Sequence, residues 1–476
     1  MPGSAKTTMK NYDDHLRRIR IRNLPRTYRD AISLTRRLGY RYVWIDSLCI
    51  IQDSPADWTR ESAAMGKIYS HSFCTLAAAA SNDCHGGLFP LRKELPIFQL
   101  EDSATGAKGS SFVLVKQAYQ GWDELFDSSS LNVRGWTLQE RELSPRIVYF
   151  TKHTLLFECR ETRGSECGGY KANSLGRYAS ERPDCQIHPG YILTAKTSIE
   201  KTDTRRCMDT LPLDSNPQDK SRRLLNKRYQ TWREMVQRYS ARDLTIASDR
   251  FPALSGLASE MSYLLNDEYI AGLWRNEIKS GLCWTYPLTH QIGSARQTNY
   301  GPSWSWAATT APISYELVNR NEKGQPVRKL RTIRAVKGAR LWLLSHGDKT
   351  LSNNDNDPAW KDVFEPKLLS VSKIPAGDDP NGTLLSASLR FEGQVIPIQR
   401  SKIGDCIIDE FRVEVMWDYL PQPPSEIYLF SLGIISVGLV LTAVSKDDHE
   451  YKRVGILSEI EWSWFRGVDT GLITLV

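Results

Sequence analysis

Hydrophobic and polar positions along the first 160 residues follow two alternating patterns, one typical of helices and one typical of buried strands. Apolar residues recur at three- and four-residue spacing over 25–39 and over 54–70, which predicts a helix in each range. Short runs of β-branched, aromatic or small apolar residues predict buried strands at 40–46 and 73–80. Strand followed by helix is typical of a βα unit, so the N-terminal part of the chain is expected to be an α/β domain.

The pattern changes farther along the chain. Residues 161–220 show little periodicity and are predicted to form an irregular linker or insertion, whereas helical spacing returns over 221–265. After residue 330 short apolar runs alternate with turns, which predicts a β-rich region. The expected organisation is an N-terminal domain over 1–160, a linker over 161–220, a helical region over 221–310 and a β-rich region over 311–476.

The predicted strand at 40–46 ends in an acidic residue, Asp46. Open parallel sheets place their chemistry at the carboxyl ends of their strands, so Asp46 is a candidate functional residue. Capping of the turn that follows the strand is the alternative role for this carboxylate.

A second candidate segment lies at 134–146, where a predicted helix carries Trp136 and Glu140 four residues apart and therefore on one face. Arg134 stands at the entrance of this helix. Partial burial beside an indole can tune the basicity of a carboxylate. In a purely structural interpretation Trp136 belongs to the core and Glu140 pairs with a nearby arginine: Arg141, Arg146 or Arg41.

Composition narrows the class of protein. Hydrophobic residues make up 41% of the chain, as in a globular protein. The longest apolar run, 428–444, contains two serines and two glycines and is expected to form a pair of core strands, not a membrane span. The first 30 residues are polar and basic, without the apolar stretch of a secretory signal. The expected location is therefore the cytoplasm.

Charge and cysteine usage exclude further classes. Nine arginines between residues 17 and 41 are expected to lie mostly on the solvated face of a helix, so nucleic acid is not an expected partner. The nine cysteines lack the spacing of a disulfide framework or a zinc site, which favours reduced thiols and no metal. The motifs of conventional hydrolases, kinases and dinucleotide-binding enzymes do not occur, and no resident cofactor is expected.

Five motifs in the first 140 residues have a characteristic order and spacing. They are Leu24-Pro25-x-Thr27-x-x-Asp30-Ala31-Ile32, Tyr42-Val-Trp44-Ile45-Asp46-Ser47-Leu48-Cys49-Ile50-Ile-Gln52-Asp53, Trp58-x-x-Glu61-x-x-x-Met65-x-x-Ile68-Tyr69, Gly87-Leu88-Phe89 and Arg134-Gly135-Trp136-Thr137-Leu138-Gln139-Glu140. This arrangement resembles the fungal heterokaryon-incompatibility (HET) domain. A weaker resemblance to the downstream region of such proteins continues over 239–307, where the tryptophans are expected to be core residues.

The resemblance implies a role in fungal non-self recognition, in which HET-domain proteins trigger growth arrest or cell death when incompatible hyphae fuse. It implies signalling through protein partners or self-association. HET domains are further thought to be similar to TIR domains, with a flavodoxin-like parallel sheet. In enzymatic TIR domains a Trp-Cys-x-x-Glu helix supplies a glutamate that cleaves NAD. Residues 136–140 match that spacing, with Thr137 in place of the cysteine.

By this analogy NAD is a candidate substrate, and Glu140 would stabilise positive charge on the ribose as nicotinamide leaves. Asp46 would orient the ribose or Arg134, and Trp136 would wall the site. The competing hypothesis is a signalling module without enzymatic activity. HET domains usually begin with a strand that precedes the region equivalent to residues 5–30, so the sheet is expected to lack its first strand. An inactive truncated remnant is the third interpretation.

Overall fold

The computed structural model divides the chain into two compact units, Met1–Leu193 (unit 1) and Thr194–Val476 (unit 2). The structure describes residues 6–92, 97–101, 112–116, 129–160, 163–166, 217–287, 300–315, 318–320, 326–329, 365–400, 406–408, 411–413, 415–418, 424–434, 437–445, 447–458, 460 and 462–476.

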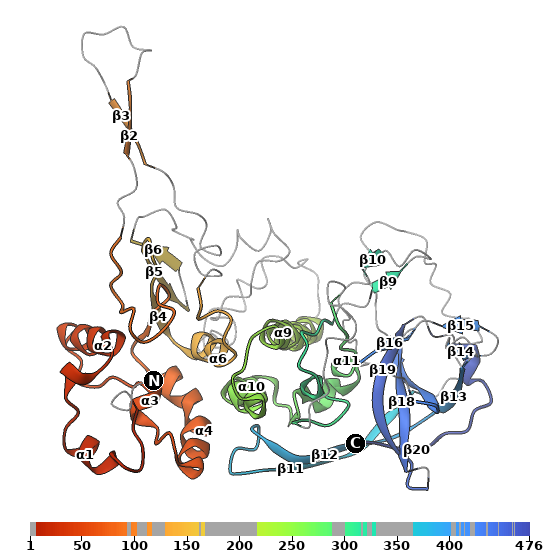
Figure 1. Ribbon diagram of the computed structural model, residues 1–476. Helices are drawn as coiled ribbons and strands as arrows, with labels where there is room; N and C mark the ends of the chain where they lie inside the picture. The colour runs from red at the N-terminus through yellow and green to blue at the C-terminus, as the bar shows by residue number, and fades with distance from the viewer. Residues whose placement is uncertain are drawn as a thin grey trace. The chain divides into compact units, whose positions relative to one another are not determined.

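Unit 1 combines short helices with a small mixed sheet (Figure 1). Its helices are α1 (Tyr12–Arg17), η2 (Ile21–Asn23), α2 (Arg26–Arg37), α3 (Asp46–Cys49), α4 (Pro55–His71) and α6 (Trp136–Leu143). Its sheet has the order β1 (Thr75–Ala77), β4 (Arg146–Phe150), β5 (Leu155–Cys159) and β6 (Arg163–Ser165). Strands β2 (Ile97–Glu101) and β3 (Phe112–Lys116) form a separate antiparallel hairpin.

Local sequence signals explain the two long helices of unit 1. Helix α2 follows Pro25 and ends at Arg37, two residues before Gly39, whose φ of +82° is a conformation that glycine adopts readily. Helix α4 begins after Ser54, whose hydroxyl accepts a hydrogen bond from the Asp57 amide at 3.3 Å. The predictions of helices over 25–39 and 54–70 are therefore confirmed.

The sheet of unit 1 buries apolar side chains on both faces. Ala31 of α2 packs with Leu88 and Phe150 on one face, while Ile147, Tyr149 and Leu156 form a separate cluster. The α/β class is thus confirmed. However, only β1 and β4 pair in parallel, and the other pairs of this sheet are antiparallel. The described residues do not confirm a TIR-like parallel sheet.

The strand predicted at 40–46 is wrong, because residues 42–45 join no sheet and α3 begins directly at Asp46. Propensity alone does not make a strand, which needs a neighbouring backbone for its hydrogen bonds. The apolar side chains of this segment serve separate purposes. Trp44 packs edge-on against Tyr69 with ring centroids 5.7 Å apart, Ile45 joins the Leu24 cluster, and Tyr42 is 83% exposed.

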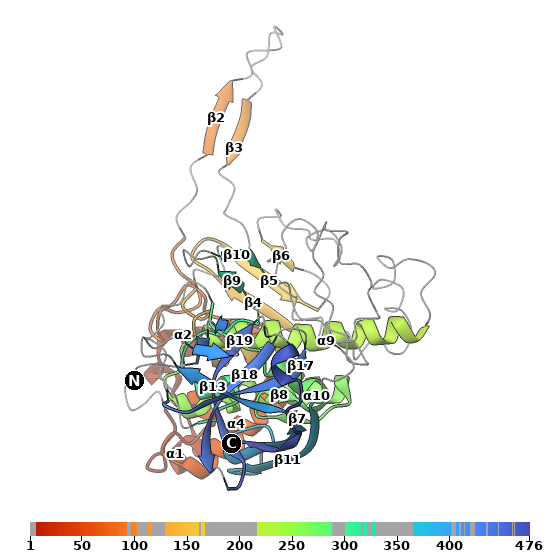
Figure 2. The same ribbon diagram turned by 90° about the vertical axis from the view of Figure 1, so that its right-hand side faces the viewer.

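Unit 2 begins with helices, among which α9 is the longest one described (Figure 2). Its helical elements are α9 (Pro217–Ser240), η3 (Ala247–Arg250), α10 (Pro252–Leu265), η4 (Arg275–Glu277), α11 (Ile278–Gly281), η5 (Trp306–Ala308) and η7 (Trp462–Phe465). The helical spacing over 221–265 therefore predicted α9 and α10 correctly. Most of the expected linker over 161–220 lies outside the described residues.

The C-terminal part of unit 2 is built on a ten-stranded sheet. Its strands run in the order β11 (Lys367–Pro375), β12 (Leu384–Gly393), β20 (Gly471–Leu475), β19 (Glu450–Ser458), β18 (Val437–Ser445), β17 (Ile427–Ile434), β13 (Val395–Arg400), β14 (Cys406–Ile408) and β15 (Phe411–Val413), with β16 (Met416–Trp417) beside β19. Small hairpins are formed by β7 (Tyr269–Ile270) with β8 (Leu273–Trp274) and by β9 (Val318–Arg320) with β10 (Pro326–Lys329).

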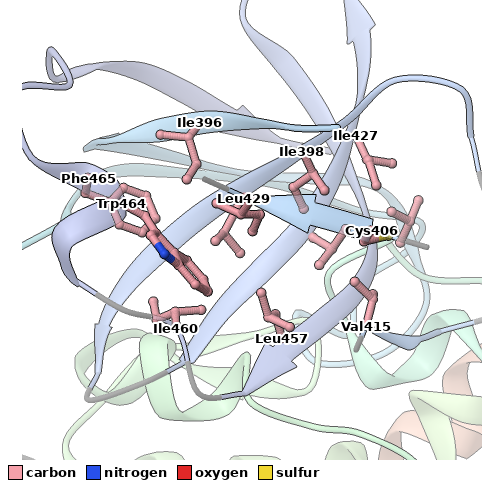
Figure 3. Packing of buried hydrophobic residues seen from close by; sticks show 13 residues of the cluster. Ile396, Ile398, Cys406, Val415, Ile427, Leu429, Leu457, Ile460, Trp464 and Phe465 are labelled. Atoms are coloured by element: carbon pink, nitrogen blue, oxygen red, sulfur yellow. The ribbon is translucent and has the colours of Figure 1, made fainter. Parts of the chain in front are cut away.

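One face of this sheet carries a large apolar cluster, over which Trp464 and Phe465 of η7 lie (Figure 3). The antiparallel pair β17–β18 passes through this region, so the apolar run at 428–444 forms two core strands as predicted. The β-rich character expected after residue 330 is confirmed, although the run at 336–344 lies outside the described residues. None of the helices in the described part of the chain is long and apolar enough to span a membrane.

The downstream motifs form an indole-rich core in unit 2. The Gly272 carbonyl accepts hydrogen bonds from the indoles of Trp232 at 3.0 Å and Trp306 at 3.2 Å. A Cβ on Gly272 would lie 2.3 Å from the Trp306 indole nitrogen, so this close approach requires glycine. Trp274, Trp304 and Trp306 are all buried, which confirms that the tryptophans of this region are core residues.

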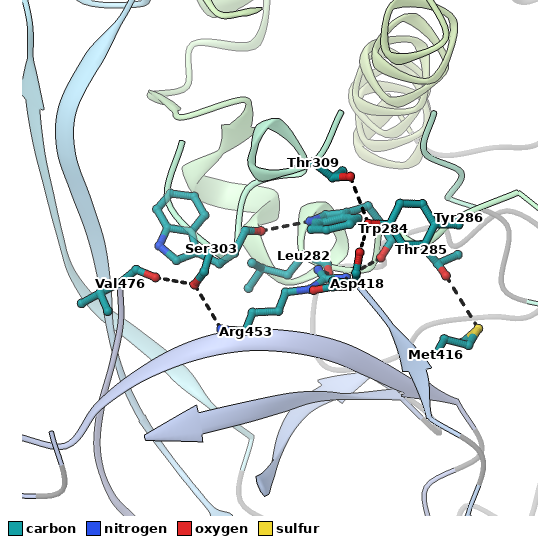
Figure 4. A network of polar contacts seen from close by, with 11 residues as sticks. Leu282, Trp284, Thr285, Tyr286, Ser303, Thr309, Met416, Asp418, Arg453 and Val476 are labelled. Carbon is teal, nitrogen blue, oxygen red and sulfur yellow. Dashed lines mark hydrogen bonds and ion pairs between the residues drawn. The ribbon is translucent and has the colours of Figure 1, made fainter. Parts of the chain in front are cut away.

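A buried arginine joins the helical part of unit 2 to its sheet (Figure 4). Arg453 of β19 donates from Nε and Nη2 to Asp418 at 2.7 and 3.0 Å, and also donates to the carbonyls of Leu282 and Trp284. Its guanidinium lies 3.6 Å from the centroid of the Trp284 ring. Because these carbonyls follow α11 while Arg453 belongs to the sheet, the two parts share one polar core.

Candidate functional site

The candidate site lies where α4 packs against α6 in unit 1. Trp58 of α4 and Trp136 of α6 meet edge to face with ring centroids 6.4 Å apart. Met65, two turns after Trp58, is buried on α4. Trp136 is thus half-buried and partly packed.

Three of the predicted site residues interact electrostatically with the hydroxyl of Tyr69, which lies near the end of α4. Its side chain forms a hydrogen bond with Glu140, and the charges of Glu140, Asp46 and Arg134 all act on it. Burial is the main cause that raises the pKa of Tyr69 well above its usual value, and the two carboxylates add to the rise. Tyr69 is therefore a neutral donor to the Glu140 carboxylate.

Tyr28 of α2 is a second tyrosine that interacts with these charged residues. The hydroxyl of Tyr28 is 2.8 Å from Ser47 Oγ, and Asp46 and Arg134 also act on it electrostatically. Burial raises the pKa of Tyr28, so this hydroxyl is also neutral. We call Asp46, Tyr69, Arg134 and Glu140 the charge cluster.

The two carboxylates of the charge cluster have different surroundings. Asp46 is exposed, and its Oδ1 accepts a hydrogen bond from the Ser47 amide at 2.7 Å. It is the first residue of α3, whose N-cap is Ile45 and which has no side-chain cap hydrogen bond. Glu140 is half-buried on α6, one turn after Trp136. The fold thus brings Asp46, Arg134 and Glu140 together even though the strand expected to deliver Asp46 does not form.

A buried ion cluster holds α6 on the sheet. Arg141 donates from Nε and Nη2 to the two carboxylate oxygens of Glu158, both at 3.0 Å. The same carboxylate accepts from Tyr149 at 2.7 Å and from Arg163 at 2.7 Å. Burial alone would raise the pKa of Glu158, but the two guanidiniums lower it far below its usual range. Because Arg141 directly follows Glu140, this cluster fixes the helix that presents the candidate carboxylate.

The other arginines that could have neutralised Glu140 also have identifiable contacts. The guanidinium of Arg146 lies over the ring of Phe73 and donates to its carbonyl at 3.3 Å. The guanidinium of Arg41 lies 5.6 Å from the ring centroid of Tyr42. The guanidiniums of Arg146 and Arg41 are therefore directed at the rings of Phe73 and Tyr42.

Two of the sequence motifs have a structural role. The Gly87 amide donates to Thr27 Oγ1 at 3.1 Å, and the Leu88 amide donates to Asp30 at 3.0 Å. Gly87 has a φ of +84°, and a Cβ there would lie 2.6 Å from the Asp30 carboxylate. The first turn of α2 therefore binds the Gly87-Leu88 turn, and these residues stabilise the domain.

Sequence reasoning missed the tyrosine hydroxyls and the ion cluster. Tyr69 was visible only as an apolar position of α4, and no local pattern connects it to Glu140. A signal for the ion cluster did exist, because Glu158 interrupts an apolar strand at a position on the same face as Leu156. Within the described part of the chain, no group of three or more potential metal ligands occurs.

Comparison with known proteins assigns the region that contains this site. Residues 3–140 match the family model described as "Heterokaryon incompatibility protein (HET)". The match ends at Glu140 and includes the whole charge cluster. No curated protein and no solved structure matches the chain.

Proposed function

We propose that this chain is a signalling or cell-death effector of heterokaryon incompatibility, because its residues 3–140 match the HET family model. The family match is the observation that carries this proposal. The effector would act in non-self recognition between fungal hyphae, through self-association or through another recognition protein. The packed charge cluster of unit 1 supports an N-terminal domain that retains its functional centre.

A second candidate function is NAD cleavage by Glu140, and the charge cluster is the observation that favours it. Glu140 is half-buried, accepts a hydrogen bond from a neutral tyrosine and has Asp46 and Arg134 as charged neighbours. A carboxylate held in this way suits a reaction in which positive charge develops beside it. Trp136 on the same helix face offers an aromatic wall.

In this reaction the bond between the ribose C1′ and the nicotinamide nitrogen breaks, and its electron pair remains on nicotinamide. Glu140 would stabilise the oxocarbenium-like ribose and then accept a proton from the water that attacks C1′. The products are nicotinamide and ADP-ribose. Tyr69 would hold the Glu140 carboxylate in place, while Asp46 would bind a ribose hydroxyl or orient Arg134.

The substitution Glu140→Gln separates the two functions because it preserves shape and removes the charge. Loss of an electrostatic group of this kind lowers a turnover rate by about 10²–10³. Growth arrest caused by NAD cleavage should disappear in this variant, whereas arrest caused by protein association should persist. Asp13→Asn, an exposed position on α1, is the matched control.

The purified proteins provide the second readout. NAD consumption by the unsubstituted chain and by Asp13→Asn, but not by Glu140→Gln, would establish the enzyme. Folded, soluble protein that consumes no NAD would overturn the enzymatic function and leave association as the mode of signalling.

A further inference from the structure

The positive charge of this chain is concentrated in one surface segment of unit 1. The whole chain carries a formal net charge of +7. Residues 17–41 contain nine arginines, no lysine and a single acidic residue, Asp30, so this segment alone carries a net charge of +8. All nine arginines are exposed. The rest of the chain is therefore close to neutral, and residues 17–41 form a local basic surface.

Part of this charge is arranged as a line along α2, which we call the arginine stripe. Its members are Arg26, Arg29, Arg36 and Arg37. Their spacings of three, seven and eight residues place them on one face of the helix, opposite the buried Tyr28 and Ala31. Because a helix rises 1.5 Å per residue, the stripe is about 17 Å long.

Ion pairs leave most of the stripe uncompensated. Within the described part of the chain, Arg26 is the one member that forms an ion pair, with Asp30 at 3.8 Å. The Asp30 carboxylate also accepts a hydrogen bond from the Leu88 amide. The exclusive use of arginine favours a ligand that carries phosphate or carboxylate groups, because a guanidinium binds a pair of oxygens with two parallel hydrogen bonds.

Exposed aromatic rings lie at the C-terminal end of the stripe. The Tyr40 amide donates to a carbonyl in the last turns of α2, and its ring centroid is 4.4 Å from that of Phe73. Tyr40 is 40% exposed, Phe73 54% and Tyr42 83%. The guanidinium of Arg41 lies 5.6 Å from the Tyr42 ring centroid. These three rings, which we call the aromatic platform, place a large exposed aromatic surface beside the positive charge.

We propose that the arginine stripe and the aromatic platform bind single-stranded nucleic acid. Phosphates would lie along the stripe, and unpaired bases would stack on the exposed rings of Tyr42 and Tyr40. At 3.4 Å per stacked nucleotide, the stripe accommodates about five phosphates. The arginines by themselves fit the solvated helix face expected from the sequence, and the adjoining rings are what the structure adds. This inference does not rest on the proposed function.

Two other anionic partners fit this surface less well. The apolar face of α2 packs inside unit 1, through Tyr28 in one cluster and Ala31 in another. The helix therefore cannot insert that face into a bilayer, as an amphipathic surface helix does. An acidic protein segment would offer carboxylates to the stripe, but only a nucleic acid repeats a flat ring beside every anionic group.

Fluorescence anisotropy of the full-length protein tests the role of the stripe, with labelled single-stranded RNA and DNA of about twelve nucleotides as probes. Four phosphate contacts predict that log K falls with log[salt] at a slope of about −2.8, so the affinity should fall about fiftyfold between 50 and 200 mM salt. Arg36→Gln/Arg37→Gln should reduce this slope by about 1.4. Arg390→Gln/Arg466→Gln, at two exposed arginines of unit 2, is the matched control and should leave it unchanged.

Tyr42→Ala tests the platform separately from the charge. Loss of one stacked base should weaken binding by about five- to a hundredfold while the salt slope stays the same. Tyr263→Ala, at a tyrosine of unit 2 that is 71% exposed, should bind like the unsubstituted chain. Failure to bind either probe, or undiminished binding in both the stripe and platform variants, would overturn the proposal. Equal or tighter binding of polyglutamate or of anionic phosphatidylserine vesicles would also overturn it and assign the surface to that partner.

Discussion

The ion cluster around Glu158 offers a quantitative test of how α6 is held. Glu158→Gln keeps the size of the side chain but removes the negative charge that serves Arg141 and Arg163. Arg141 is 6% exposed and Glu158 is 2% exposed, so the substitution leaves a guanidinium buried without its counter-charge. Breaking a buried pair in this way costs about 3–5 kcal/mol, whereas a surface pair contributes about 0–1 kcal/mol.

Hydrogen exchange of the full-length protein measures this loss locally. A loss of about 3–5 kcal/mol corresponds to amide exchange in β4 and β5 that is faster by about two to four orders of magnitude. Arg92→Gln removes an ion pair with Glu166 that is partly exposed on both sides, so exchange in that variant should change less than tenfold. Equal exchange in Glu158→Gln and in the unsubstituted protein would refute the argument that this cluster holds α6.

Three further outcomes follow from the structure. In denaturant unfolding, Gly87→Ala should destabilise unit 1 by about 1–3 kcal/mol more than Gly39→Ala does. Both glycines have a positive φ, but only at Gly87 would a Cβ clash with the Asp30 carboxylate. Equal losses of stability in the two variants would contradict this clash. Arg453→Met should cost about 3–5 kcal/mol by leaving its carboxylate partner buried, and a change below about 1 kcal/mol would contradict the shared polar core. Folding lowers the pKa of Glu158, so the ionised carboxylate stabilises unit 1 at neutral pH, and this contribution is lost as the pH falls below the ordinary carboxyl range. The denaturation midpoint should therefore fall less steeply with acid in Glu158→Gln than in the unsubstituted protein.

Local signals in the sequence predicted the helices of unit 1 well. Pro25 and Gly39 bracket α2, and Ser54 caps α4, because these residues act on the backbone beside them. The strand predicted at 40–46 does not form, for the opposite reason. A strand depends on a partner that lies far away in the sequence. In this segment Trp44 and Ile45 instead pack individually, while Tyr42 and Val43 are exposed.

The candidate site was predictable in its members but not in its geometry. The motif resemblance selected Asp46, Arg134 and Glu140, and in the fold all three act electrostatically on one tyrosine hydroxyl. Which tyrosine would join them depends on how α4 crosses α6, and neither helix determines that alone. Likewise, the contact of Arg141 on α6 with Glu158 on β5 depends on how the helix packs on the sheet, which no local pattern determines.

Induced expression of the full-length chain in a fungal host tests the central claim most directly. An incompatibility effector should arrest growth or kill the cells when it accumulates as soluble protein, and Asp13→Asn should do the same. Cells that grow normally while the soluble, folded chain accumulates would contradict the proposed function.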